Sequence, residues 1–185
     1  MDTPRLISTG KKTALISFIG GTFIIILLYF SNDVIFGVLG LGYTVIMLII
    51  NIIVLVRLSN QANKDKINRD NIFKIVRLMF LNIPIAILYF WVAIVLLNTV
   101  RITFINSTQT EIEDVKIKGC EEKYIQKLSP GQSKTVWVNI PNDCGVSIVY
   151  KIDGQMKEEN VTGYVTNEGG YIMSFKIGTN QKIDY

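Results

Sequence analysis

The sequence contains no histidine, and only two of its 185 residues are cysteines. Without histidine, Ser-His and Cys-His nucleophilic sites cannot form, nor can most catalytic zinc sites. A glycine-rich phosphate loop is also missing, because Gly20-Gly21 lies within an apolar run and no Lys-Ser/Thr follows it. The carboxylate pairs Glu121-Glu122 and Glu158-Glu159 remain, but adjacent strand residues point to opposite faces and loop acids are usually solvated. We therefore expect that the protein is not an enzyme and uses no metal or cofactor.

Charged residues are also scarce, and they are unevenly placed. They make up 18% of the chain, against about 25% in an average soluble protein, while 49% of residues are hydrophobic. Residues 1–100 hold nine Lys/Arg against four Asp/Glu, a balance of +5, whereas residues 101–185 hold ten against eleven. The basic groups flank apolar runs and form no patch interleaved with aromatic residues, so we do not expect nucleic-acid binding.

Three long apolar runs occupy the first hundred residues. The third, from Leu78 to Val100, is about 23 residues without a charge, closed by Arg77 and Arg101. At 1.5 Å per residue, such a helix crosses a hydrocarbon layer of about 30 Å. Residues 1–100 therefore form a predicted transmembrane domain, with helices at about 13–32, 34–56 and 76–100.

The basic residues also predict the topology of this domain. In short loops Lys and Arg stay on the cytoplasmic side of the membrane. The basic segments 1–12 and 57–77 should therefore face the cytoplasm, and the turn Ser31-Asn32-Asp33, which has no basic residue, should lie outside. With three crossings, everything after the third helix should also lie outside.

Few polar groups lie within the apolar runs, and none of them is charged. Asn51 is about six residues before Arg57, and Asn82 about five after Arg77, which places both amides at a similar depth. One hypothesis is that Asn51 and Asn82 bond each other across the helix pair, worth on the order of 0.6 kcal/mol. The other is that each amide reaches the lipid headgroups separately.

From residue 101 the hydrophobic pattern changes to a period of two. Turn signals such as Ser129-Pro130-Gly131, Asp153-Gly154 and Gly169-Gly170 separate about seven short strands within residues 101–185. This spacing is typical of an all-β sandwich near the lower size of an Ig-like domain. We predict three transmembrane helices followed by a small antiparallel Ig-like β-sandwich.

Both cysteines, Cys120 and Cys144, fall in this second domain. A disulfide suits an oxidising compartment and would stabilise so small a domain by about 3.5 kcal/mol, since it closes a loop of about 25 residues. A metal pair is the weaker alternative because two thiols without histidine are too few ligands. A redox dithiol is also weaker, because the C-x-x-C spacing is absent.

Several motifs of the second domain resemble a known group of modules. They are I-x-D-V-x-I-x-G over 112–119, L-S-P-G-Q-S over 128–133, an approximate V-x-Y-x-x-D-G over 148–154, and G-Y-V-T…G-G over 163–170. The pattern resembles small extracytoplasmic Ig-like β-sandwich modules of uncharacterised bacterial membrane proteins. The resemblance implies a fold and a compartment, and it brings no catalytic residue.

Together these observations predict a non-enzymatic protein of the bacterial inner membrane with a cytoplasmic N-terminus and an extracytoplasmic C-terminal domain. Its expected partners are the lipid bilayer and another protein at the extracytoplasmic face. Two versions fit: an accessory subunit of a membrane complex, or an immunity-type protein that shields the cell from a toxin. The alternative is a sensor or channel component whose β-domain binds a small ligand and signals through residues 57–77.

Overall fold

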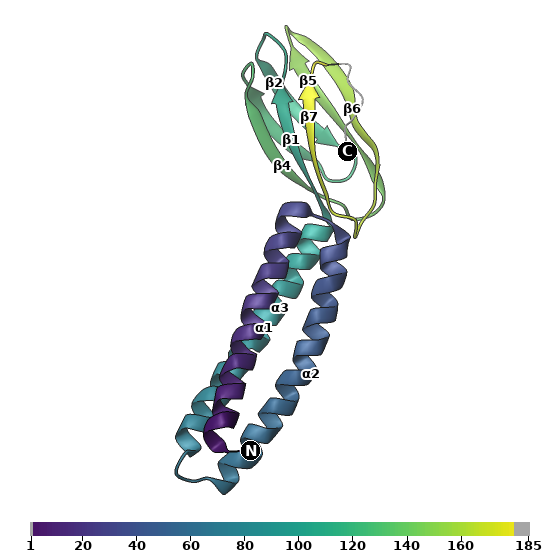
Figure 1. The fold of residues 1–185 in the computed structure, drawn as a ribbon. Helices are drawn as coiled ribbons and strands as arrows, with labels where there is room; N and C mark the ends of the chain where they lie inside the picture. Colours follow the sequence, from purple (N-terminus) through teal and green to yellow (C-terminus); the bar gives the residue numbers. More distant parts are fainter. Residues whose placement is uncertain (1, 180–185) are drawn as a thin grey trace. The chain divides into compact units, whose positions relative to one another are not determined.

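The computed structural model describes residues 2–179, which form three helices followed by seven strands (Figure 1). The chain divides into two compact units. The helical unit comprises Met1–Phe30 and Ile35–Ala93, and the β unit comprises Ser31–Val34 and Ile94–Tyr185. The predicted fold class, a helical membrane-type region followed by a small β domain, is confirmed.

The helices are α1 (Thr3–Ser31), α2 (Val34–Lys64) and α3 (Arg69–Leu97), and each is long and apolar enough to cross a membrane. They extend beyond the predicted spans at their basic ends, where α1 begins at Thr3 rather than residue 13 and α2 continues to Lys64. The prediction counted uncharged residues only, whereas Lys, Arg and Gln also favour a helix. At its other end α3 stops at Leu97 rather than Val100, because the chain enters a strand.

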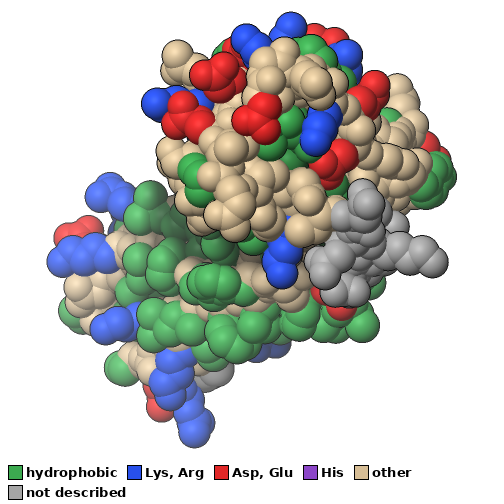
Figure 2. All heavy atoms as spheres, turned by 90° about the horizontal axis from the view of Figure 1, so that it is seen from above, with side chains coloured by type: hydrophobic (Ala, Val, Ile, Leu, Met, Phe, Trp, Pro, Cys, Tyr) green, Lys and Arg blue, Asp and Glu red, His purple; other side chains and the backbone are tan. Residues whose placement is uncertain are grey.

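The helical unit buries side chains mainly toward the basic ends of its helices. A cluster from all three helices packs there: Leu6, Ala14, Val54, Leu58, Ala62, Ile72 and Met79. Farther along, most large apolar side chains are exposed, and Figure 2 shows hydrophobic side chains dominating the surface of the helices. An apolar surface of this extent suits a hydrocarbon solvent rather than water.

The β unit contains a three-stranded and a four-stranded sheet, with orders β4-β1-β7 and β3-β2-β5-β6. Four of the strand pairs are antiparallel, and β1 with β7 forms a parallel pair within the described residues. The strands are β1 (Thr99–Asn106), β2 (Ile112–Lys118), β3 (Lys123–Leu128), β4 (Ser133–Asn139), β5 (Cys144–Ile152), β6 (Gln155–Val165) and β7 (Tyr171–Ile177).

The two sheets share one hydrophobic core, as the period-two pattern predicts. Ile102, Phe104 and Phe175 come from the first sheet, and Ile148 and Tyr150 from the second. The rings of Phe104 and Phe175 meet edge to face with centroids 6.3 Å apart. Alternate residues of each strand point into this core, which leaves one outer face on each sheet.

One end of the β unit, which we call the base, holds the last turn of α3. It consists of Ser31–Val34, residues 94–98, and the loops at 119–122, 140–143 and 166–170. The amide of Gly170 donates to the carbonyl of Leu97 at 2.9 Å, and that of Ile140 donates to the carbonyl of Asn98 at 2.8 Å. These bonds fix the end of α3 to the β6–β7 loop and to the end of β4.

The turn between α1 and α2 also belongs to the base, through Asn32. Asn32 adopts φ +51° and is only 3% exposed. Gly170 adopts φ +58°, and a Cβ placed there would lie 2.9 Å from Asn32 Nδ2 and 3.2 Å from the Asn32 carbonyl oxygen. Glycine is therefore required at position 170 for both its backbone conformation and the space that Asn32 fills.

We expect Gly170→Ala to destabilise the β unit by about 2–3 kcal/mol, since left-handed strain and the contact with Asn32 add up. Gly131→Ala is the matched control, because Gly131 adopts φ +75° with nothing within 4 Å of an added Cβ. It should lose only about 1 kcal/mol. Chemical denaturation of the full chain in detergent measures both, and equal losses would contradict the packing of Asn32 against Gly170.

Candidate functional site

The two membrane amides, Asn51 and Asn82, do not bond each other; each reaches α1 instead. Asn51 Nδ2 donates to Ser17 Oγ at 2.8 Å and to the Met47 carbonyl at 2.7 Å. Asn82 Nδ2 donates to the Ala14 carbonyl at 3.0 Å. Depth alone led to the hypothesis of a direct pair, but acceptors on α1 lie within reach of both amides. The hypothesis of a direct Asn51–Asn82 bond is therefore wrong.

Other hydroxyl groups extend this pattern, so that α1 connects α2 with α3. Tyr43 on α2 donates to the Ile16 carbonyl at 2.6 Å, and Tyr89 on α3 shares a hydrogen bond with Thr22. Sequence reasoning missed these contacts, although hydroxyl residues within uncharged runs were the available signal. They join helices through neutral groups, which is a structural role.

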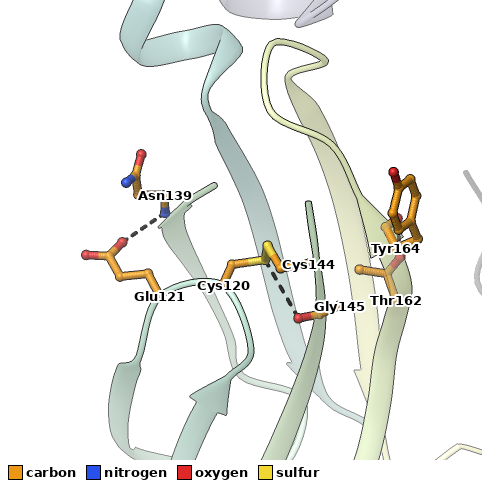
Figure 3. Close-up of a disulfide and its surroundings, with 7 residues drawn as sticks. All are labelled: Cys120, Glu121, Asn139, Cys144, Gly145, Thr162 and Tyr164. Atoms are coloured by element: carbon orange, nitrogen blue, oxygen red, sulfur yellow. Dashed lines mark hydrogen bonds between the residues drawn. A yellow bond between two sulfur atoms is a disulfide. The ribbon is translucent and has the colours of Figure 1, made fainter. Parts of the chain in front are cut away.

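The cysteines form the predicted disulfide (Figure 3). Cys120 in the loop after β2 is bonded to Cys144, the first residue of β5, with their Cα atoms 5.3 Å apart. The two cysteines are 24 residues apart in sequence. By constraining the unfolded chain, a disulfide across such a loop stabilises the folded domain by about 3.5 kcal/mol. It joins a loop of the base to the central strand pair β2–β5 of the larger sheet.

Glu121, next to the disulfide, fixes the same loop to β4. Its Oε2 accepts from the Asn139 amide at 2.8 Å, and its Oε1 pairs with Lys123 Nζ at 2.8 Å (Figure 3 shows the first bond). The bond from Lys123, followed by that from Asn139, lowers the pKa of the Glu121 carboxyl. Because the ion pair is partly exposed, it contributes at most about 1 kcal/mol.

Two titratable groups of the β unit, Tyr150 and Glu159, bond to each other. The buried Tyr150 donates to Glu159, which also accepts from the Gly178 amide at 3.1 Å. Burial, and then the neighbouring Glu159, raise the pKa of Tyr150. Within residues 2–179, no group of three or more His, Cys, Asp or Glu side chains is arranged to hold a metal ion.

The outer face of the three-stranded sheet has few charges. In register across β4, β1 and β7, its rows are Trp137–Arg101–Ile172, then Thr135–Thr103–Ser174, then Ser133–Ile105–Lys176. The hydroxyls of Thr103 and Thr135 share a hydrogen bond of 2.8 Å. We call the second and third rows the neutral face, because Lys176 is the one charged residue among these six.

The outer face of the four-stranded sheet has a different composition. Its rows carry charged residues, as in Lys127–Glu113–Lys151, where three lie side by side, and in Lys116–Val149–Glu158, where Val149 lies between two. Mixed charges of this density are typical of a solvated surface. The two outer faces of the β unit thus differ in chemistry, and the neutral face is the stronger candidate for binding.

Comparisons with known proteins provide no family. No family model matches the chain, and no curated protein matches it. A solved structure, the NMR structure of a protein from Eubacterium rectale, is similar over 43% of this chain and 80% of its own length, with 13% sequence identity and a TM-score of 0.33. Likeness at this level carries no argument about function.

We expect Asn51→Leu and Asn82→Leu to destabilise the helical unit additively, by about 0.6 kcal/mol each, because the amides bond different atoms of α1. Asn51→Leu and Ser17→Ala should instead be non-additive, since they remove the same hydrogen bond. The free energy of unfolding of the reconstituted single and double variants measures both pairs of substitutions. Strong coupling between Asn51 and Asn82 would contradict the geometry and restore the direct contact.

Proposed function

We propose that the protein is a membrane-anchored binding module whose β unit presents the neutral face to another protein. The observation that supports this most is the difference between the two outer faces of the β unit. Depletion of charged residues distinguishes the centre of a protein interface from ordinary surface, and the neutral face has one charge among six residues. A catalytic role has no comparable support.

We also propose that the β unit lies outside the cytoplasm of a bacterial cell, on the inner membrane. The nine Lys/Arg residues before residue 100 all lie at the start of α1, the end of α2, the start of α3 or in the loop between the last two. Short basic segments stay on the cytoplasmic side, which places the opposite helix ends outside. The disulfide supports the same placement, because disulfides persist in oxidising compartments.

On this proposal, Ser174→Cys labelled in intact spheroplasts of the native cell with a membrane-impermeant, photoactivatable maleimide should capture one discrete protein. Ser174 is exposed on the neutral face, and both native cysteines are bonded and do not compete for the reagent. Lys116→Cys, exposed on the charged face, is the matched control and should be labelled without capturing that protein. Mass spectrometry of the irradiated products reads the result.

Lys66→Cys, in the loop between α2 and α3, checks the orientation in the same experiment. It should react only after lysis. Labelling of Ser174→Cys only after lysis would refute the extracytoplasmic placement. Labelling in intact cells that yields the same products as Lys116→Cys would refute the neutral face as the binding surface.

The identity of the captured protein separates the two biological versions. An accessory subunit should be captured together with its complex in every growth condition. An immunity-type protein should capture a toxin only when that toxin is supplied, and its loss should alter survival only then.

A sensor is the second candidate, favoured by the construction of the base. The β6–β7 loop bonds the last turn of α3, while the α1–α2 turn packs against Gly170 in the same loop. A ligand that shifts this loop would move the ends of all three helices. Such a protein would show ligand-dependent protease sensitivity within residues 57–77, which a simple binding module would not.

A further inference from the structure

We propose that the base of the β unit rests in the phospholipid headgroup layer, held by a collar of amphipathic side chains. The collar consists of Tyr124, Trp137, Tyr164 and Ile172, and the buried Arg101 packs behind Trp137. Its occupant is a phospholipid surface, recognised through the exposed rings and apolar side chains of the collar rather than through a protein partner. The proposal is independent of the neutral face, which lies farther from the base along β4, β1 and β7.

The collar residues share one position along the β unit, although they come from both sheets. Tyr124 and Ile172 are the second residues of β3 and β7, which start at the base. Trp137 and Tyr164 lie two residues and one residue before the ends of β4 and β6, which finish at the base. The side chains therefore surround the base on four strands.

Exposure of large apolar side chains is concentrated at this level. Tyr124 is 52% exposed, Trp137 38%, Tyr164 60% and Ile172 48%. Among the described strand residues, Met156 is the one other large hydrophobic side chain with comparable exposure, at 60%, and it lies at the far end of β6. Four exposed side chains gathered at one level form a belt rather than the scattered exposure of an ordinary surface.

The chain keeps this belt close to the end of α3. Arg101 follows Leu97 by four residues, which span at most about 14 Å even when fully extended. The hydrogen bonds of Leu97 and Asn98 to Gly170 and Ile140 keep the base attached to that helix end. If α3 crosses the bilayer with Leu97 still within the hydrocarbon, the collar lies within reach of the headgroup region, which extends about 5–8 Å beyond the hydrocarbon on each side.

The side chains have the chemistry that this layer selects. Trp and Tyr rings prefer the membrane interface, where the ring is in an apolar environment and the N–H or O–H is hydrated. The Tyr164 hydroxyl donates to Asp143 Oδ2 in a base loop at 2.6 Å, which holds this ring at the base. The Arg101 guanidinium carbon lies 5.2 Å from the centre of the Trp137 ring, so the two form a cation–π pair on the collar.

The chain has two tryptophans, so Trp91→Phe leaves Trp137 as a single native reporter in the full-length protein. In phosphatidylcholine–phosphatidylglycerol vesicles, spin labels on the lipid headgroup should quench Trp137 at least about twofold more than labels near the acyl-chain end, since the ring lies at the interface. Iodide should quench it weakly. The matched control, Trp91→Phe/Trp137→Phe/Met156→Trp, places the reporter at the far end of β6, where iodide should quench strongly and lipid labels should not.

Two results would overturn the proposal. Trp137 quenched by iodide as strongly as the reporter at position 156 would show that the base stands in water. Trp137 shielded from both iodide and lipid labels would show that protein, either this chain or a second copy, covers it. Quenching by the headgroup label in the presence of weak iodide quenching supports the collar.

Discussion

The connection between α3 and β1 is the constraint on which the rest of the structure depends. Asn98 alone separates the last residue of α3 from the first residue of β1. Hydrogen bonds from Gly170 and Ile140 satisfy the carbonyls of Leu97 and Asn98, which would otherwise be unpaired at a helix end. With no linker, the chain passes from helix to strand within one turn. The first strand of the β unit therefore begins directly at the end of α3.

The helical unit exposes its apolar side chains and the β unit buries them, which is the pattern expected if lipid surrounds the first and water the second. The helical unit exposes most of its large apolar side chains and directs its few polar groups, such as Asn51 and Asn82, toward α1. The β unit buries its apolar residues in one core and exposes charged groups, as Figure 2 shows for one view. In lipid, neutral hydrogen bonds between helices add specificity at low cost. In water, the small β core needs the disulfide as an additional constraint.

The sequence was sufficient for the parts that depend on local pattern, and insufficient for the parts that depend on neighbours. Alternation predicted all seven strands, and Asp153-Gly154 forms its predicted turn with φ +50° and +78°. The disulfide followed from two cysteines in one small domain.

The parallel pairing of β1 with β7 was not foreseen, since it joins strands far apart in the chain. The acceptors on α1 were missed for the same reason, because a helix span says nothing about which neighbour an amide will face. The collar and the neutral face required the strand register.

The central claim is that the boundary between lipid and water falls between the end of α3 and the third residue of β1. Spin labels placed one at a time from position 90 to position 105, in the protein reconstituted in vesicles, test it directly. Up to about Leu97, the labels should be more accessible to oxygen than to a water-soluble nickel complex, and this difference should vary with a helical period. Within the next four residues the nickel complex should become the more accessible reagent, and accessibility should then alternate with a period of two residues. A gradual change across the whole window, or water access already near position 90, would contradict the account.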